Sequence, residues 1–234
     1  MNYYPICLDI TGRHCIVIGG GKVAARKAQG LLDHQARVTM ISPELGEESA
    51  ALHAANLLTW LARPYQEGDL TGAFLVIAAT DNPEVQERIH AEAEQNNILL
   101  NVADVPKWCN FILPATVRRD DFSLAISTGG KSPALAKRMR KELENQFGPE
   151  YGILLATLGA LRPLVLNLKR PHEENKQLFE QLLHDDMVFW IRDNQWDKVL
   201  DHLRKVLGEQ VPLDCLAAIQ AQCAHSSAGS ADHE

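Results

Sequence analysis

The chain has 234 residues, of which 46% are hydrophobic and 23% are charged, as is ordinary for a globular protein with a sizeable core. A formal net charge of −7 disfavours a nucleic-acid partner, and no apolar run reaches the roughly 18 residues of a membrane-spanning helix. Residues 1–9 lack the basic and then apolar layout of a signal peptide, so we expect a cytoplasmic protein. The five cysteines form no CxxC pair, which argues against a disulfide framework or a structural zinc site.

The first elements predict a strand, a glycine turn, a helix and a second strand. Residues 14–18 are apolar and mostly β-branched, and Gly19-Gly20-Gly21 follows them. Apolar residues then recur at near-helical spacing over 22–34, and 37–41 reads as a strand. A βαβ unit within about 30 residues is the context that the dinucleotide-binding fingerprint requires.

The alternation of strands and helices continues to about residue 102. We expect a helix over 44–55, strands over 57–61 and 74–79, a helix from Pro83 to about 96 with Asn82 as its N-cap, and a strand over 98–102. Strands that alternate with helices predict a doubly wound parallel sheet.

The pattern changes near residue 104. Short strands are predicted at 111–113, 116–118 and 122–127, followed by a helix from Ser132-Pro133 to about Phe147, with Gly148 as its stop. Beyond residue 151 the sequence is helical, with breaks near 170–171 and 208–212. The last residues, 221–234, are mostly Ser, Ala, Gly and His, and we expect a disordered tail there.

The glycine turn fits the pattern GxGxxG/A. Gly19 permits the tight turn, Gly21 lets the backbone approach a pyrophosphate, and Ala24 allows the helix to pack closely on the strand. The helix that begins with Lys22 and Val23 presents free N–H groups and a positive dipole to the phosphates. A tight turn in an α/β protein without a nucleotide is the alternative, but the flanking strand and helix favour a dinucleotide.

The residue that usually selects NAD or NADP departs from the common pattern. The second strand usually ends in an acid that binds the ribose 2′-hydroxyl, but here Ser42 and Pro43 occupy that place. Ser42 could hydrogen-bond the ribose, and no Arg stands directly beside it to favour a 2′-phosphate. We therefore expect NAD and leave NADP open.

Polar residues follow the later predicted strands. In open α/β sheets the carboxyl ends of the strands face the ligand crevice. Thr80 and Asp81 are therefore expected beside the nicotinamide, with helix capping as the alternative. Asn101 and Asp104 end the next strand. A carboxylate such as Asp104 could accept a proton from a substrate, whereas the alternative is a solvated loop aspartate or a helix cap.

A basic stretch lies within this acidic chain, because residues 129–141 contain five cations and no acid. The glycine-containing loop before the helix at Pro133 is a favourable anion site. Its expected contacts to an anionic substrate are Ser127, Thr128, Gly129, Gly130, Lys131 and, on the helix, Arg138. The alternative is a solvated helix face paired with Glu142 and Glu144. The nine histidines show no HxxxH or HxH pair, so we expect no preformed metal site.

These motifs, taken in order, resemble a known family. The matching segments are PICLD at 5–9, GR at 12–13, VIGGGKVAARK at 17–27, VT at 38–39, SPEL at 42–45, AATD at 78–81, NVAD at 101–104, FILPA at 111–115 and STGGKSPALA at 127–136. Over residues 1–147 the chain resembles the precorrin-2 dehydrogenases of sirohaem (porphyrin-type) biosynthesis. The helical remainder is similar only in type.

The resemblance implies oxidation of precorrin-2 to sirohydrochlorin with NAD, with Asp104 as the catalytic residue and Asn101 and the glycine loop at the tetrapyrrole. Some family members also insert ferrous iron as sirohydrochlorin ferrochelatases, and the macrocycle supplies the nitrogen ligands. The family forms homodimers through a small central domain. The expected organisation is therefore an NAD-binding Rossmann domain over 1–112, a small α+β dimerisation domain over 113–149, a helical domain over 150–220 and the tail over 221–234.

Two other functions stay open. The first is an NAD(P)-sensing Rossmann module without catalysis, although a sensor has no need for a tetrapyrrole-sized anion site. The second is an NADP-dependent reductase of another substrate, which the missing acid at Ser42 permits.

Overall fold

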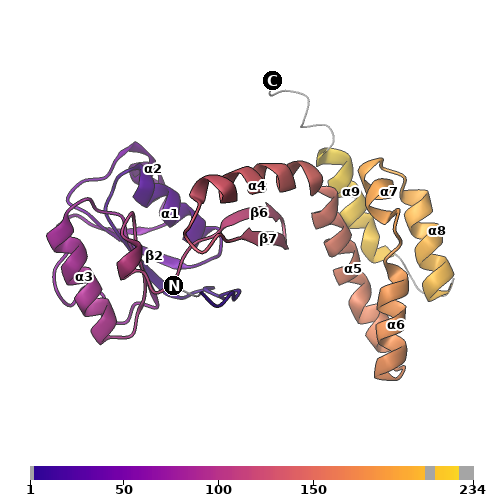
Figure 1. Cartoon of the computed structure of the whole chain (residues 1–234). Helices are drawn as coiled ribbons and strands as arrows, with labels where there is room; N and C mark the ends of the chain where they lie inside the picture. Colours follow the sequence, from indigo (N-terminus) through magenta and orange to yellow (C-terminus); the bar gives the residue numbers. More distant parts are fainter. Residues whose placement is uncertain (1–2, 209–213, 227–234) are drawn as a thin grey trace. The chain divides into compact units, whose positions relative to one another are not determined.

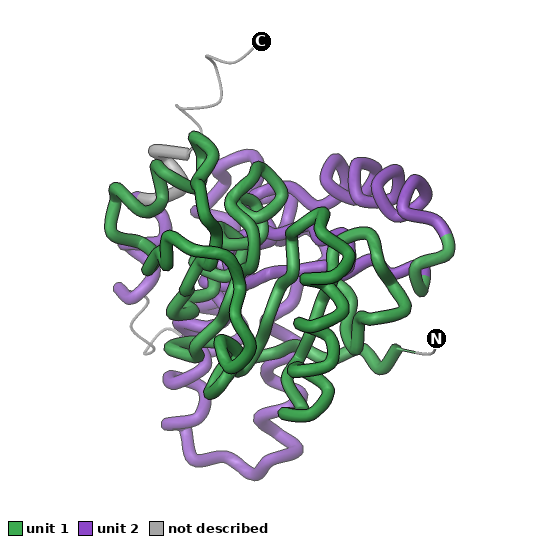
Figure 2. The backbone as a smooth tube through the Cα atoms, turned by 90° about the vertical axis from the view of Figure 1, so that its left-hand side faces the viewer, with its two compact units in different colours: residues 1–113, 129–131 green, residues 114–128, 132–234 purple. Residues whose placement is uncertain are grey.

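A computed structural model gives the fold of the chain (Figure 1) and describes residues 3–208 and 214–226. The chain divides into two compact units, which Figure 2 colours separately. Unit 1 holds residues 1–113 together with 129–131, and unit 2 holds 114–128 together with 132–234. No helix among the described residues is long and apolar enough to cross a membrane.

Unit 1 is built on a parallel sheet of five strands in the order β3-β2-β1-β4-β5. The strands are β1 (His14–Ile18), β2 (Arg37–Ile41), β3 (Thr59–Leu61), β4 (Leu75–Ala78) and β5 (Leu99–Val102), and the helices are α1 (Lys22–Leu32), α2 (Glu47–Ala54) and α3 (Pro83–Gln95). The predicted doubly wound sheet is confirmed. All four residues of β4 are buried, as expected for a parallel strand covered on both faces.

The sheet separates two apolar cores, because successive residues of a strand face opposite sides. Cys15 and Val17 of β1 pack with Ala28 of α1, whereas Ile16 of the same strand packs with Ile89 of α3. Figure 1 accordingly shows α1 and α2 on one side of the sheet and α3 on the other. The carboxyl ends of β1, β4 and β5 therefore lie together at the same end of the sheet, since these strands are parallel neighbours.

The strand predicted at 111–113 is wrong. The free side of β5 is occupied by Asn110, whose side-chain oxygen accepts from Leu100 N at 2.8 Å and whose side-chain nitrogen donates to Ile98 O at 2.8 Å. Its backbone N–H also donates to Leu100 O at 3.1 Å. Asn110, together with Cys109 at Val102, thus binds the backbone groups of β5 that a sixth strand would have paired.

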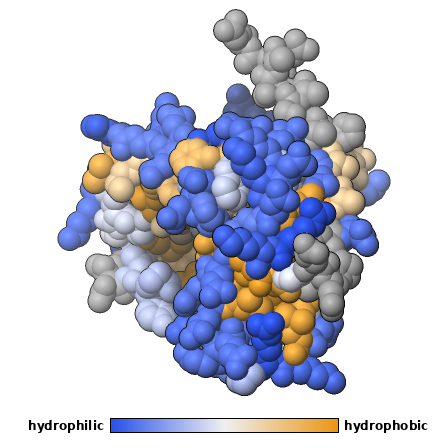
Figure 3. Space-filling view, turned by 90° about the vertical axis from the view of Figure 1, so that its right-hand side faces the viewer, coloured by the Kyte–Doolittle hydropathy of each residue, from blue (hydrophilic) through white to orange (hydrophobic). Residues whose placement is uncertain are grey.

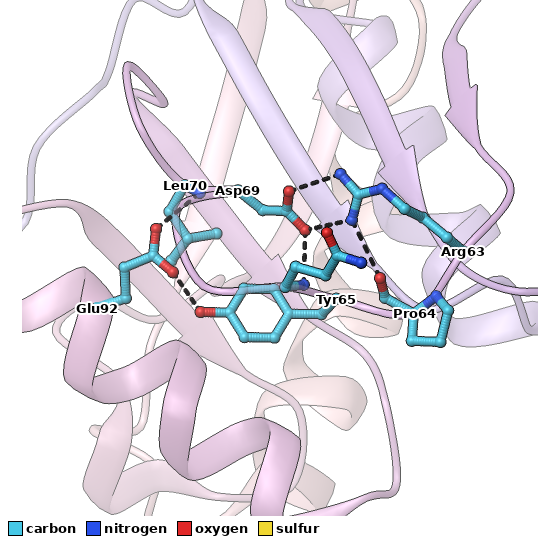
Figure 4. A network of polar contacts seen from close by, with 7 residues as sticks. Arg63, Pro64, Tyr65, Asp69, Leu70 and Glu92 are labelled. Carbon is cyan, nitrogen blue, oxygen red and sulfur yellow. Dashed lines mark hydrogen bonds and ion pairs between the residues drawn. The ribbon is translucent and has the colours of Figure 1, made fainter.

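A buried carboxylate fastens the long connection between β3 and β4 to α3 (Figure 4). The Glu92 carboxylate accepts a short hydrogen bond from the Tyr65 hydroxyl and another from Leu70 N at 2.9 Å. Burial, followed by the bond to Glu92, raises the pKa of Tyr65 far above its ordinary value, so the hydroxyl keeps its proton. A bidentate Arg63–Asp69 ion pair, with both bonds at 2.7 Å, closes the same connection.

We expect Glu92→Leu to destabilise unit 1 by about 3 kcal/mol, because it leaves two buried donors, the Tyr65 hydroxyl and Leu70 N–H, without an acceptor. Glu92→Gln can still accept from Leu70 and donate to the Tyr65 oxygen, so its loss should be clearly smaller. Urea denaturation of the two variants and the wild type measures both free energies of unfolding. Equal stability of Glu92→Leu and the wild type would show that the hydrogen bonds of Glu92 to Tyr65 and Leu70 do not stabilise unit 1.

Unit 2 begins with a small antiparallel hairpin and continues as helices. Its elements are β6 (Ala115–Arg119), β7 (Phe122–Ile126), α4 (Pro133–Gln146), α5 (Glu150–Asn167), α6 (His172–Leu182), α7 (Met187–Arg192), α8 (Trp196–Leu207) and α9 (Ala217–Ser226). Two 3₁₀ turns complete the fold, η1 (Pro106–Trp108) in unit 1 and η2 (Asp214–Leu216) in unit 2. The predicted break at 170–171 is confirmed. The break predicted at 208–212 begins as expected, because α8 ends before Gly208 with φ +90°, and residues 209–212 lie outside the described part.

The hairpin and the long helix α5 are packed into one unit. A Cβ at Gly152, in the first turn of α5, would lie 2.8 Å from Arg119 O, so only glycine allows this approach. Phe122, Phe147 and Tyr151 form an aromatic cluster beside it, with ring centroids 4.8 to 5.7 Å apart. Tight packing therefore joins the segments on either side of residue 149, and the domain boundary expected there stays a prediction.

The expected disorder from residue 221 is wrong for residues 221–226, which belong to α9. Ala and Gln are good helix formers, and they outweigh the polar composition there. Residues 227–234 of the predicted tail lie outside the described part.

Hydrophobic side chains also reach the surface (Figure 3), and in unit 2 those at least 40% exposed include Leu155, Leu166, Leu183 and Phe189.

Candidate active site

The turn after β1 leaves room for a ligand at Gly21. Gly19 has φ +118°, and a Cβ there would lie 2.3 Å from Ala79 O, so glycine is required. At Gly21, by contrast, a Cβ would meet nothing within 4 Å. Gly21 is the N-cap of α1, and no side chain caps that helix. The first amides of α1 thus border open space, and these residues fit a pyrophosphate.

Gly20 is the tightest position of the turn, although the motif treats it as variable. A Cβ at Gly20 would lie 2.1 Å from Glu44 O and 2.7 Å from Ser42 Oγ. Its carbonyl also accepts a hydrogen bond from Gly46 N at 2.9 Å. Gly20 therefore joins the turn to the loop after β2, and the run of three glycines was the signal for it.

Ser42 is buried next to Gly20, so little of its side chain is exposed to a ligand. The side chain is buried, and its hydroxyl donates to Glu44 O at 2.5 Å. A ribose contact by Ser42 would therefore have to use the hydroxyl oxygen as acceptor. Pro43 and Glu44 are exposed beside it. These contacts do not distinguish NAD from NADP.

The residues after β4 divide between capping and exposure. Asn82 is the N-cap of α3, as predicted, and its side-chain oxygen accepts from Glu84 N at 3.0 Å and Val85 N at 3.2 Å. Thr80 O accepts from the Gln86 side chain at 2.6 Å. Asp81 is exposed and is not needed as the cap, so its carboxylate is available at the carboxyl end of β4.

Asp104 stands on a sharp turn just after β5. Its φ is +62°, in the left-handed region, and Val105 N donates to Val102 O across the turn at 3.4 Å. The Cys109 sulfur fastens this turn, because it accepts from Val102 N at 3.2 Å and is within 3.3 Å of Val102 O as donor. The turn is thus held by the segment that follows it.

Asn101 has a structural task that the sequence did not indicate. Its side-chain nitrogen donates to Phe111 O at 3.1 Å and to the Cys109 sulfur at 3.7 Å. These bonds tie β5 to the segment after η1. The expected contact of Asn101 with a substrate would therefore fall to its side-chain oxygen.

The loop before α4 is closed by its own side chains. The Thr128 hydroxyl donates to Ser132 O at 3.1 Å and accepts from Ser132 N at 3.3 Å. Gly129 and Gly130 both have positive φ, +59° and +77°, which permits the sharp bend. The helix α4 begins where it was predicted, with Ser132 as its N-cap, whose hydroxyl accepts from Leu135 N at 3.2 Å. Ser127 and Lys131 are exposed on either side.

Arg138 is paired within its own helix. Its Nε donates to Glu142 Oε1 at 2.8 Å, and the side chain is 78% exposed. Arg140 pairs with Glu144 in the same way. This is the solvated, paired face that the sequence left as the alternative, so a substrate contact by Arg138 stays a prediction. Nowhere in residues 3–208 and 214–226 do three or more His, Cys, Asp or Glu gather as a metal site would require.

Comparison with known proteins identifies the family. Residues 6–115 match the family model described as "Putative NAD(P)-binding", and 119–146 match "Sirohaem biosynthesis protein central". "Siroheme synthase 1" of Aeromonas salmonicida is 40% identical over 188 residues, which are 80% of this chain and 40% of that protein. The chain belongs to the sirohaem synthase family. "Siroheme synthase 1" of Pectobacterium atrosepticum is 33% identical over 99% of this chain and 48% of its own length.

The part of the sirohaem synthases that matches is the precorrin-2 dehydrogenase module. The chain spans less than half the length of these curated relatives. In contrast, it covers 98% of a solved structure, "SirC, precorrin-2 dehydrogenase", with a TM-score of 0.74 and 27% identity over 87% of this chain.

The two regions of this chain that match family models contain every residue that the sequence predicted for the site. The glycine turn, Thr80, Asp81, Asn101 and Asp104 lie within 6–115, and the loop and Arg138 lie within 119–146. The helices from α5 onward lie outside both regions.

Proposed function

We propose that this chain oxidises precorrin-2 to sirohydrochlorin with NAD. The observation that carries the proposal is Asp104, an exposed residue on a turn that Cys109 fixes at the same end of the sheet as the open glycine turn. A carboxylate that could accept a proton and a turn that could bind a dinucleotide belong to the same unit, which supports the proposal. Membership of the sirohaem synthase family supplies the substrate class.

The reaction removes two hydrogens from precorrin-2, one as hydride and one as a proton. Bound NAD supplies the hydride acceptor, so that precorrin-2 and NAD⁺ give sirohydrochlorin, NADH and a proton. The amides at the start of α1, beside the open space at Gly21, would hold its pyrophosphate. Asp104 accepts the proton from the substrate.

The polycarboxylate substrate is held by the loop over residues 127–131. Its left-handed glycines bend the backbone just before the N-terminus of α4, where amide groups attract anions. Lys131 is exposed in this loop and adds a positive charge. A homodimer in the cytoplasm, with the hairpin β6–β7 and α4 at its interface, completes the proposal.

Anaerobic conversion of precorrin-2 tests this function. We expect the absorption spectrum of sirohydrochlorin and one NADH formed per molecule, with NADP a poorer acceptor than NAD. Binding of NAD without any conversion would instead support the sensing module. Faster conversion with NADP would overturn the choice of cofactor.

A further inference from the structure

Trp60, on the edge strand β3, is bonded to the loop that follows β2. Its indole N–H donates to Ser42 O at 2.9 Å, and Ser42 N donates to Leu61 O at 3.3 Å. Both backbone groups of Ser42 are therefore held by β3, directly after the last residue of β2. The indole is half-buried against the core on the α1 side of the sheet, so its bond to Ser42 is partly shielded from water.

The orientation of the indole ring is fixed by α2. The His53 imidazole, in the last turn of that helix, meets the ring of Trp60 edge to face, with centroids 5.6 Å apart and planes at 70°. His53 Nδ1 also lies 3.4 Å from Leu58 O, which ties the imidazole to the segment before β3. A ring that is packed in this way keeps its N–H directed at Ser42 O.

The loop that Trp60 holds lies against the glycine turn. Gly46 N donates to Gly20 O at 2.9 Å, and a Cβ at Gly46 would lie 3.8 Å from Gly21 Cα. In a doubly wound fold the pyrophosphate of a dinucleotide binds at the turn after the first strand, and its adenosine ribose binds at the end of the second. A displacement at Ser42 would therefore move the wall of both parts of the site.

We propose that Trp60 is a positioning residue of the dinucleotide site, whose hydrogen bond to Ser42 O holds the loop over residues 42–46 in the form that binds the adenosine half. The inference rests on the proposed binding of NAD. Trp60 acts on the backbone of this loop and not on the group at the 2′ position of the ribose, so it supports NAD and NADP alike. A loop that already has its binding form loses less conformational entropy when the ligand binds, which raises the affinity.

Titration of the wild type and Trp60→Phe with NAD and with ADP, in the absence of precorrin-2, tests the inference. Phenylalanine keeps an aromatic ring in unit 1 but has no N–H to donate. We expect the affinity for both ligands to fall by about three- to tenfold, the range that the loss of one hydrogen bond corresponds to. ADP carries the adenosine and the diphosphate without the nicotinamide, so an equal loss for both ligands assigns the effect to the adenosine half.

Turnover separates a positioning role from general damage. In Trp60→Phe the KM for NAD should rise by a similar factor, whereas kcat at saturating NAD and the KM for precorrin-2 should keep their wild-type values. Benzothienylalanine in place of Trp60 keeps the shape of the indole and has sulfur instead of the N–H, so it should reproduce the loss with the packing intact. Trp190→Phe is the matched control, since Trp190 lies on α7 of unit 2, and it should bind both ligands as the wild type does.

Wild-type affinity for NAD and ADP in both variants at Trp60 would overturn the inference. So would a lower kcat with an unchanged KM for NAD, because the loop would then act on the reaction and not on binding. A loss in Trp60→Phe that benzothienylalanine does not reproduce would make packing, and not the hydrogen bond, its cause. If the wild type bound NAD but did not convert precorrin-2, the proposed function would fail, while the titrations would still decide the role of Trp60.

Discussion

Replacing Asp104 with asparagine is expected to slow precorrin-2 oxidation by about a hundredfold to ten-thousandfold, the range over which one positioned general base contributes to a rate. The amide keeps the size of the carboxylate but cannot accept a proton. Asparagine also tolerates the left-handed backbone that φ +62° requires, so the turn after β5 is preserved. Alanine would add backbone strain at the same position, so the loss of the carboxylate could not be separated from a disturbed turn.

Anaerobic single-turnover kinetics with saturating NAD measures this loss directly. Asp120→Asn is the matched control, because Asp120 is also left-handed, with φ +52°, but lies between β6 and β7. We expect Asp120→Asn to react at the wild-type rate and Asp104→Asn to bind NAD normally. A variant at Asp104 that oxidises precorrin-2 at the wild-type rate would remove this residue from the reaction and leave the proton acceptor to another group.

The parts of the fold that the sequence predicted are those decided by local chemistry. The βαβ unit follows from the spacing of apolar residues around three glycines, and Asn82 before Pro83 is a strong helix start. Both depend on residues that are neighbours in the chain. The carboxyl-edge placement of Asp104 follows from the same alternation, because parallel strands end at one edge.

The parts that were missed depend on residues distant in sequence. The segment 111–113 has the composition of a strand, but Asn110 and Cys109 already bind the backbone groups on the free side of β5. The structural task of Asn101 likewise depends on Cys109 and Phe111, which follow β5 in the chain. Arg138 shows the opposite case, since a basic helix face fits an anion site or a set of ion pairs equally well in sequence.

Gly20→Ala is expected to damage the dinucleotide site, although Gly20 stands at a position that the motif GxGxxG leaves variable. The added Cβ would lie 2.1 Å from Glu44 O, a backbone atom that cannot rotate away as a side chain can. The loop from Ser42 to Gly46 must therefore shift, and with it the bond from Gly46 N to Gly20 O. We expect unit 1 to lose about 1–3 kcal/mol of stability through overpacking, together with at least about tenfold in NAD affinity.

Two other glycines separate this clash from general effects of alanine. Gly30→Ala, on α1 with open space around it, should stabilise the helix by about 0.5–1 kcal/mol. Gly21→Ala should leave the stability near that of the wild type, since a Cβ there meets nothing within 4 Å, but should weaken NAD binding by filling the approach to the amides of α1. Denaturant unfolding and NAD titration of the three variants measure both properties. Wild-type stability and NAD affinity in Gly20→Ala would show that the loop after β2 moves aside at no cost. The close contact of Gly20 with that loop would then not be needed for NAD binding.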